Sequence, residues 1–210
     1  LLWQSKEKRR LQESLSEGLL TAQETERKRI AKELHDSVGQ QLTLIKQKAQ
    51  HDAQEEYASL TNAALEEVRG ISRGLYPVVL QQLGLSESLE QLIIELDEKT
   101  PLNFFTEIED VDSYFNEEQS LNLYRFAQEV MSNILKHAEA STVTIQLLDE
   151  PQHIKLFIKD DGKGFQFSEQ LKQQSLGLKT LVERIRILKG ILQVDSTPGS
   201  GTIITAKIEK

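Results

Sequence analysis

The sequence predicts two domains of different fold class: an all-α domain that supplies two helices to a dimeric four-helix bundle, and an α+β sandwich after it. No proline occurs before Pro77, and apolar residues recur at helical spacing through two long segments, about 5–50 and 55–75. Their apolar stripes are narrow, so a second copy of the chain is expected to close the bundle. After Pro101 the pattern changes to β-rich runs that alternate with helical segments, which is typical of a sandwich.

Composition is typical of a folded protein with long exposed helices and narrows the choice of partners. Of the 210 residues, 38% are hydrophobic and 28% are charged. A net charge of -8 with a pI near 5.2 argues against direct nucleic-acid binding, because domains that bind nucleic acid are usually basic. There is no cysteine, which excludes a disulfide scaffold, and no apolar run of the ~18 residues that a membrane span needs.

The first residues resemble the end of a membrane helix. Leu1, Leu2 and Trp3 precede a basic cluster, as at the cytoplasmic exit of such a helix, although an ordinary helix boundary has the same composition. The chain begins with leucine, and its single methionine is Met131. We therefore expect a cytoplasmic fragment of a membrane-anchored protein. Its expected parts are a signalling helix or coiled coil (1–20), the bundle domain (21–78) and the sandwich domain (79–210).

The stretch from Glu26 to Ile45 is expected to form one uninterrupted helix. Its apolar stripe has steps of four, four, four and three: Ile30, Leu34, Val38, Leu42 and Ile45. His35 follows Leu34 and so lies roughly 100° round the helix, at the edge of the stripe and within reach of solvent. Asp36 comes next, and Gln40 lies one turn beyond it on the same face. These three groups can form a chemical site; a solvated helix flank that carries one histidine is the alternative.

The remaining segments are predicted from periodicity and from turn residues. The second helix should end before Pro77, residues 77–85 should form a linker, and Ser86 should cap a helix through Leu96. Further helices are expected at 116–138 and 178–188, and strands at 102–109, 141–148, 153–160, 191–196 and 202–209. The polar segment from Gln166 to Ser175 is expected to act as a lid.

Three motifs in the second half contain groups that suit a nucleotide. In QEVMSNILKHA, one helix face carries oxygen ligands that suit Mg²⁺ and a cation that suits phosphate: Glu129, Asn133, and Lys136 or His137. In DDGKGF, two glycines allow close approach of a ligand, and Asp160 can accept a hydrogen bond from a buried amine. SLGL places Gly177 at a helix start, whose free N–H groups favour a phosphate. A polar outer helix face and a plain turn are the alternatives for the first two motifs.

In this order, the three motifs and TPGSGT resemble the N, G1, G2 and final G segments of a Bergerat-fold ATPase. ERKRIAKELHD followed by SVGQ resembles the phosphoacceptor helix of sensor histidine kinases. It is similar to the nitrate-sensor-like subfamily, in which an acid directly follows the acceptor histidine. Gyrase-like, chaperone-like and anti-sigma kinase relatives share the ATPase motifs, and the upstream helix selects the histidine kinases. The resemblance covers about residues 20–208, with Ser175 where the G2 segment usually begins with glycine.

The resemblance implies a role for each matching residue. His35 would be phosphorylated, Asp36 would hydrogen-bond its other ring nitrogen and act as base, and Gln40 would orient water when a partner is dephosphorylated. Asn133 would hold Mg²⁺, and Asp160 would bind the adenine amino group. The other positions implied to bind ATP are Glu129, Lys136, Gly162, Gly164, Gly177, Leu178 and Thr202.

The implied function is ATP-dependent phosphorylation of His35, with ATP and Mg²⁺, followed by transfer to an aspartate of a response regulator in two-component signalling. The implied partners are a second copy of the chain and that regulator, which is expected to carry a helix-turn-helix output domain. A membrane is expected only through a missing N-terminal part. Two alternatives stay open: an ATPase or serine kinase of the same fold in which His35 is incidental, and a degenerate dimeric scaffold.

Overall fold

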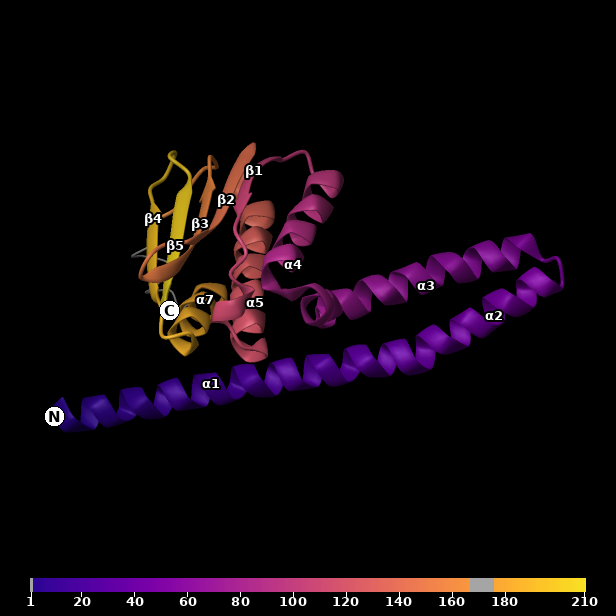
Figure 1. The fold of residues 1–210 in the computed structure, drawn as a ribbon, viewed down its shortest axis with the longest axis horizontal. Coiled ribbons are helices and arrows are strands. Elements are labelled where there is room, and N and C mark those ends of the chain that lie inside the picture. Colours follow the sequence, from indigo (N-terminus) through magenta and orange to yellow (C-terminus); the bar gives the residue numbers. More distant parts are fainter. Residues whose placement is uncertain (1, 167–175) are drawn as a thin grey trace. The chain divides into compact units, whose positions relative to one another are not determined.

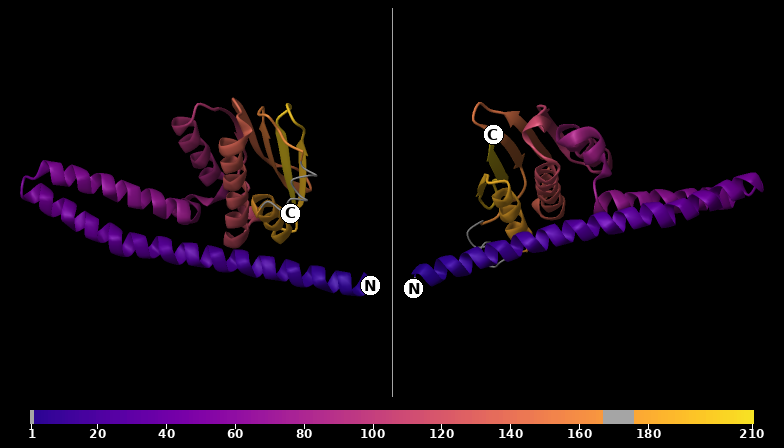
Figure 2. Two further views of the ribbon diagram at one scale, coloured as in Figure 1. Left: turned by 180° about the vertical axis from the view of Figure 1, so that it is seen from behind. Right: turned by 60° about the horizontal axis from the view of Figure 1, so that its bottom comes forward.

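The structure is a computed structural model that describes residues 2–166 and 176–210. It divides into two compact units, Leu1–Val78 and Val79–Lys210, and each is described by itself (Figure 1, Figure 2). Apart from Gln166, the predicted lid lies outside the described residues, and so does Ser175. In the part of the chain that is described, no helix is both long and apolar enough to cross a membrane.

The first unit is built of helices. In chain order they are α1 (Leu2–Glu33), the π turn η1 (Leu34–Gly39), α2 (Gln40–His51) and α3 (Glu55–Leu75). After a short turn, α3 runs back along α2, η1 and the end of α1. The break near His51 and the helix end before Pro77 are confirmed. Residues 26–45 are helical throughout, as predicted, but the π turn replaces the regular α-helical hydrogen bonding at Leu34–Gly39.

The face that α1 and α2 turn toward α3 coincides only in part with the predicted apolar stripe, of which Ile30, Leu34 and Leu42 are half-buried. Its most buried side chains are small, Ala31 at 3% and Ala49 at 6% exposed, so the helices approach closely. Ser72 of α3 donates a hydrogen bond to the Ala31 carbonyl at 3.0 Å. Two predicted stripe residues, Val38 and Ile45, are instead 36% and 53% exposed within the protomer.

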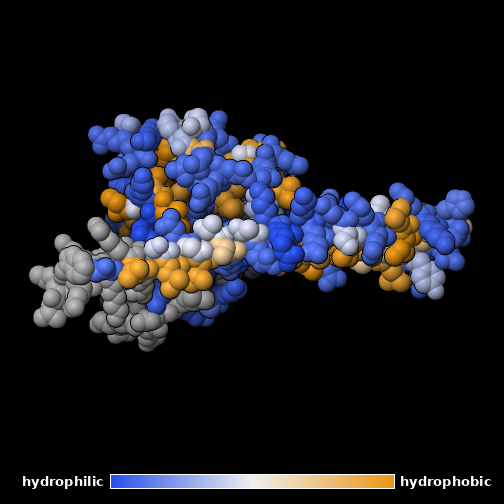
Figure 3. All heavy atoms as spheres, turned by 90° about the horizontal axis from the view of Figure 1, so that it is seen from below, coloured by the Kyte–Doolittle hydropathy of each residue, from blue (hydrophilic) through white to orange (hydrophobic). Residues whose placement is uncertain are grey.

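Large apolar side chains remain exposed along the first unit. On α1 they form a row at intervals of four residues, visible in Figure 3: Leu11, Leu15 and Leu19. Exposed leucine, isoleucine and tyrosine side chains continue on α2 and α3 at Leu44, Ile45, Tyr57, Leu60 and Ile71. A second helix pair is the usual way to bury such a surface, since a two-helix unit has no other core.

The linker predicted at residues 77–85 is mostly helical. Helix α4 spans Val78–Lys99 with a sharp kink at Gly84, where φ is 81° and ψ is -176°. A Cβ at this glycine would lie 1.7 Å from Asp112 Oδ2, so only glycine fits. The kink places the first turn and the long part of α4 on different axes.

The cap of the long part of α4 comes from another element, and the prediction that Ser86 forms it is wrong. Asp112 Oδ1, from the 3-10 turn η2 (Asp112–Tyr114), accepts hydrogen bonds from the N–H groups of Leu85 and Ser86, both at 2.9 Å. The Ser86 hydroxyl donates to the same oxygen at 3.0 Å. A carboxylate distant in sequence thus satisfies the N–H groups that the kink exposes.

The second unit is a five-stranded mixed sheet with helices on one face (Figure 1). The order across the sheet is β1-β2-β3-β5-β4, in which β1 and β2 are parallel and the other neighbours antiparallel. Helices α4, α5 and α7 cover one face. The elements after α4 are β1 (Asn103–Ile108), α5 (Glu117–Asn133), the π turn η3 (Ile134–Ala138), β2 (Thr142–Asp149), β3 (His153–Asp160), α7 (Leu176–Ile187), β4 (Ile191–Ser196) and β5 (Thr202–Glu209).

The core of this unit lies between the sheet and its helices. Every second residue of β2 and β3 points into it, and α5 adds Phe126, which is fully buried. Helix α5 begins with a reciprocal cap, in which the Asn116 side chain and the Gln119 side chain each accept from the other's backbone N–H. The predicted fold class, a helical part followed by an α+β sandwich, is confirmed.

Candidate functional site

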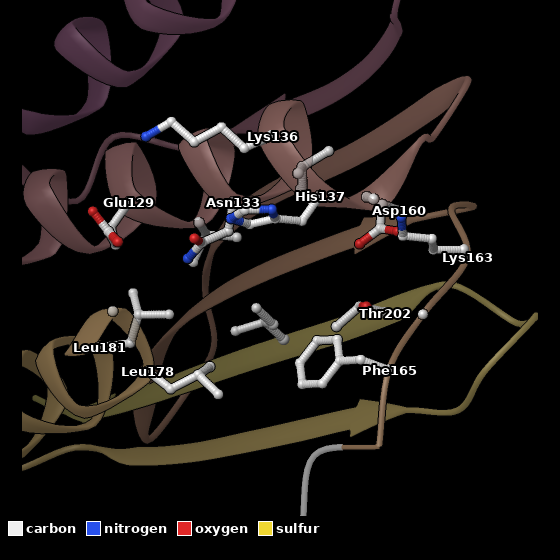
Figure 4. A pocket seen from close by; sticks show the side chains of 16 residues that line it. Glu129, Asn133, Lys136, His137, Asp160, Lys163, Phe165, Leu178, Leu181 and Thr202 are labelled. Carbon is white, nitrogen blue, oxygen red and sulfur yellow. The ribbon is translucent and has the colours of Figure 1, made fainter. Parts of the chain in front are cut away.

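A pocket of about 690 Å³ opens in the second unit beside the end of α5. Its walls come from α5 and η3, the loop after β3, the start of α7, and β5. The volume lies within the usual range for small-molecule sites. The predicted residues that line it are Glu129, Asn133, Lys136, Asp160, Gly164, Gly177, Leu178 and Thr202 (Figure 4).

Asp160 is the buried polar group of this pocket, only 3% exposed at the end of β3. Burial raises the pKa of its carboxyl group, and hydrogen bonds from Gly162 and Thr202 partly oppose the rise. The Gly162 N–H donates to Oδ1 at 2.9 Å. These contacts fix the carboxyl group in one orientation within the pocket.

The neighbouring Asp161 has the opposite environment. It is exposed, and its Oδ1 accepts hydrogen bonds from the N–H groups of Ser141 at 2.7 Å and Thr142 at 2.8 Å. These hydrogen bonds lower the pKa of Asp161. Asp161 therefore holds the start of β2 in place through hydrogen bonds, whereas Asp160 lines the pocket.

Glycines let the backbone segments behind Asp160 approach each other. A Cβ at Gly201, where φ is 73°, would lie 2.1 Å from the Asp160 carbonyl oxygen, and one at Gly164 would lie 2.1 Å from the Thr197 carbonyl oxygen. The Gly199 N–H also donates to the Lys163 carbonyl at 2.6 Å. The loop after β3 and the β4–β5 turn are therefore joined through backbone contacts.

Gly162 has a supporting position and does not line the pocket. A Cβ there would lie 2.3 Å from the carbonyl oxygen of Ala138, which accepts a hydrogen bond from the Lys163 N–H at 2.7 Å. This close approach joins the loop after β3 to the end of η3. Main-chain contacts therefore hold the loop after β3 to η3 on one side and to the β4–β5 turn on the other.

Oxygen donors lie on the α5 wall of the pocket. Glu129 and Asn133 are half-buried, and among the described residues neither side chain has a hydrogen bond or ion pair. A Cβ on Gly177 would lie 3.0 Å from Glu129 Oε1, so the glycine lets the start of α7 approach this carboxylate. In Figure 4, the Lys136 side chain extends away from Asn133.

These donors fit a magnesium ion held together with phosphate. The described residues contain no group of three or more histidine, cysteine or acidic side chains that can hold a metal by themselves. Mg²⁺ rarely needs such a group, since it takes one or two protein oxygens and completes its shell with phosphate and water. The amide oxygen of Asn133, which lines the pocket, is a group of the kind that could serve as such a ligand.

Eight lining residues were not among the predicted ligands: Val130, Ile134, His137, Ala138, Lys163, Phe165, Leu181 and Ile204. His137 was weighed in the first motif without being assigned. Lys163 and Phe165 lie inside DDGKGF, in which the sequence indicates only the glycines and Asp160 as site residues. The apolar character of Leu181 gives no signal for a binding role, because the same residue is 1% exposed and also belongs to the core.

The predicted acceptor lies on a second hollow, within the first unit. His35 is exposed, as predicted, and it lines a groove of about 420 Å³ together with Gln40, whereas the sequence predicted that Gln40 shares a face with Asp36. The other wall belongs to α3, with Leu65, Val68, Arg69 and Ser72. Asp36 is exposed but does not line the groove. Among the described residues, none forms a hydrogen bond or ion pair with the side chain of His35 or Asp36.

The fold and pocket of the second unit define the class to which it belongs. Residues 118–210 match the family model described as histidine kinase-, DNA gyrase B- and HSP90-like ATPase. Residues 26–80, which include His35 and the helices around it, match a histidine kinase family model. Because both regions occur in this order in one chain, the chain belongs to the sensor histidine kinases.

Curated relatives agree with this family. The chain is 35% identical to the sensor protein VraS of Staphylococcus haemolyticus over 195 residues, which cover 88% of this chain and 55% of the relative. It is 34% identical to VraS of Staphylococcus aureus over the same length. The chain thus spans about half the length of the curated relatives that it matches.

Solved structures support the fold. The histidine kinase domain of the blue-light activated histidine kinase EL346 from Erythrobacter litoralis has a TM-score of 0.56 at 17% identity, over 82% of this chain and 95% of that chain. A structure of EL346 itself gives a TM-score of 0.55, over 81% of this chain and 59% of that one.

Proposed function

We propose that this chain is the catalytic part of a sensor kinase that transfers the γ-phosphoryl group of ATP to His35. The observation that carries the proposal is Asp160, a buried carboxyl group held in a nucleotide-sized pocket. A buried carboxylate has several lone pairs and so can accept a hydrogen bond from the exocyclic amine of adenine in addition to those from Gly162 and Thr202. The same chain presents an exposed imidazole at His35.

Within this proposal the pocket is divided between base and phosphates. Asp160 accepts a hydrogen bond from the adenine amino group, with Thr202 behind it, and Phe165 and Leu178 supply apolar contacts to the base. The first turn of α7 offers N–H groups near Gly177 to the phosphates. Glu129, Asn133 and Lys136 belong to the phosphate end, where Asn133 provides an oxygen to Mg²⁺. When bound, Mg²⁺ offsets the charge on the transferring phosphoryl group.

The proposed reaction forms one bond and breaks one bond. An unprotonated ring nitrogen of His35 attacks the γ-phosphorus, and the bond between this phosphorus and the bridging oxygen breaks, so that ADP leaves. Asp36 accepts a hydrogen bond from the other ring nitrogen, which keeps the attacking nitrogen unprotonated and stabilises the charge that forms on the ring. Exposure of both side chains is compatible with access by a separate nucleotide-binding unit.

Further steps of the proposal involve partners. The phosphoryl group passes from His35 to an aspartate of a response regulator, which carries a helix-turn-helix output domain. Gln40, on the same groove as His35, orients water when the regulator is dephosphorylated, assisted by Asp36. A homodimer buries the exposed apolar surface of the first unit, and a membrane anchor precedes it in the full-length protein. Residues 1–20, 21–78 and 79–210 serve as signalling helix, phosphotransfer domain and ATP-binding domain.

Labelling with γ-³²P-ATP tests the proposal. We expect label on the chain that is stable in base, labile in acid and absent from His35→Gln. The matched control is His51→Gln, an exposed histidine of the same unit at the end of α2, which should label normally. ATP hydrolysis without phosphohistidine would support an ATPase instead, and absence of Mg-ATP binding would support a scaffold.

A mixing experiment identifies which subunit is phosphorylated. His35→Gln lacks the acceptor, and Asn133→Ala lacks the proposed magnesium ligand, so neither homodimer should label. Label in the mixture requires transfer between subunits. Absence of label in a mixture that forms heterodimers requires transfer within one subunit.

A further inference from the structure

The π turn at Leu34–Gly39 changes the spacing of buried positions along the acceptor helix. Before the turn, the last buried or half-buried positions are Arg27, Ile30, Ala31 and Leu34, and the Ala31 carbonyl accepts a hydrogen bond from Ser72 of α3. After the turn, the buried or half-buried positions are Gly39, Leu42, Thr43, Lys46 and Ala49, and Lys46 donates a hydrogen bond to Asn62 of α3. Between Leu34 and Gly39 the step is five, and four consecutive residues, 35–38, are exposed.

A regular α-helix cannot keep both segments on α3 with this spacing. At ~100° per residue, five residues advance the helix by roughly 500°, which leaves Gly39 about 140° away from the face of Leu34. A π turn pairs residue i with residue i+5 and so takes up one additional residue within one turn. The two α-helical segments therefore stay in phase, and α3 contacts α1, η1 and α2.

The same geometry acts on His35 and Gln40, which are also five positions apart. In an α-helix these two side chains would point ~140° away from each other. In the structure both line one groove with Gly39 and Thr43. The Thr43 hydroxyl donates to the Gly39 carbonyl at 2.8 Å, at the end of the turn.

We infer that the π turn is a positioning element for the acceptor: it absorbs one residue so that His35 and Gln40 share a groove while both flanking helices keep their packing on α3. This inference rests on the proposed function for its catalytic meaning. The structural part of the inference concerns only the number of residues in the turn. Ser37 is one of the exposed residues inside the turn and has no assigned role, so its removal shortens the segment without removing a named side-chain contact.

Deletions in the 210-residue chain test the inference. Removing Ser37 converts the five-residue steps into four-residue steps, which a plain α-helix satisfies. We expect a Tm close to that of the unmodified chain and a rate of phosphohistidine formation within about threefold of it, since the groove geometry survives. The matched control removes Gln41, an exposed residue of regular α2, and so turns Leu42–His51 ~100° away from α3. We expect this control to have a lower Tm and a lower rate of phosphohistidine formation than the unmodified chain.

An added residue gives the converse test. Insertion of alanine after Ser37 lengthens the step to six, and we expect the rate at saturating ATP to fall at least about tenfold, as misplacement of a reacting group does, with KM for ATP unchanged. Ser37→Ala keeps the length and should behave like the unmodified chain.

Cysteine pairs test the geometry without enzyme activity, because the chain has no cysteine. A thiol cross-linker that spans about one helical turn should join His35→Cys and Gln40→Cys. It should not join the control pair Gln41→Cys and Lys46→Cys, which is equally spaced within regular α2.

Each outcome decides between the two proposals. If deletion of Ser37 is as damaging as deletion of Gln41, or if the cysteine pair at 35 and 40 does not react, the inference is wrong. If the unmodified chain forms no phosphohistidine, the proposed function is wrong. The Tm values and the cross-linking yields still test whether the π turn places residues 35 and 40 on one groove.

Discussion

Asp160 and Asp161 are neighbours in sequence with opposite electrostatic environments. Burial dominates at Asp160 and raises its pKa, whereas hydrogen bonds from backbone N–H groups dominate at Asp161 and lower its pKa. The ionised form of Asp160 is thus disfavoured by folding, and that of Asp161 is favoured. Substitution of each aspartate in turn therefore separates effects on ATP binding from effects on the stability of the fold.

Asp160→Asn should weaken ATP binding at least about tenfold, because an amide replaces the proposed acceptor for the adenine amine. The Tm near neutral pH should stay equal or rise, because a buried charge is removed. Asp161→Asn is the control: it should bind ATP normally and lower the Tm. Titration of a fluorescent ATP analogue, together with thermal melts, measures both quantities. Unchanged affinity in Asp160→Asn would remove the main support for the nucleotide site.

The two shifts have opposite signs in pH dependence. The folded state binds a proton on Asp160 more tightly than the unfolded state does, so the contribution of Asp160 to stability decreases as pH rises through its raised pKa. The contribution of Asp161 is present above the unfolded pKa and is lost as pH falls through its lowered pKa. ATP affinity should fall with acidification as Asp160 becomes protonated, and Asp161→Asn should keep this dependence when affinity is measured from pH 7 downward.

At the scale of elements, the pocket depends on two connecting segments rather than on any one strand. The loop after β3 and the β4–β5 turn touch through main-chain atoms at Gly164 and Gly201. Such an approach excludes side chains, so these segments can hold Asp160 only if the glycines are kept.

Gly201→Ala and Gly199→Ala separate steric contact from backbone strain. Both glycines have positive φ, 73° and 84°, but only a Cβ at Gly201 meets another atom, the Asp160 carbonyl oxygen at 2.1 Å. We expect Gly199→Ala to cost about 1 kcal/mol from the left-handed conformation alone. Gly201→Ala should lower the free energy of unfolding by a further ~1–3 kcal/mol and weaken ATP binding, because the clash displaces the backbone of Asp160. Denaturant melts measure the difference, and equal effects would contradict this account of the turn.

At the scale of the whole molecule, the first unit leaves large apolar side chains exposed on each of its α-helices. Its exposed side chains include Leu60 at 62% and Ile71 at 51%, on the same helix that packs against α1 and α2. A second copy of the chain would bury them as the remaining half of a bundle.

Leu60→Glu should therefore raise the dissociation constant of the dimer at least about tenfold, since a charge would enter the apolar interface. The matched control is Phe105→Glu on β1 of the second unit, a position that is also 62% exposed. It should leave the dimer intact. Analytical ultracentrifugation measures both dissociation constants, and a monomeric unmodified chain would contradict the dimer.

Periodicity and turn residues predicted most of the fold because they act locally. The strands at Asn103–Ile108 and Thr142–Asp149 follow from alternation, and the helix predicted from residue 116 by its periodicity begins at Glu117, with Asn116 as its N-cap. The candidate ligands on α5 were found because their helical spacing places them on one face. Gly162 was assigned to the pocket wall, but its contact with Ala138 is tertiary and gives no signal in the sequence.

The sequence by itself determined the order of the two kinds of domain, the exposure of His35 and the set of oxygen-bearing residues around the pocket, since each depends on spacing of a few residues. Only the tertiary structure decided three other features. Asp112 caps α4 because the kink at Gly84 brings a distant carboxylate to its N–H groups. The small face of α1 meets α3, and the π turn places His35 and Gln40 on one groove, because packing on a neighbouring helix decides which face of an amphipathic helix is buried.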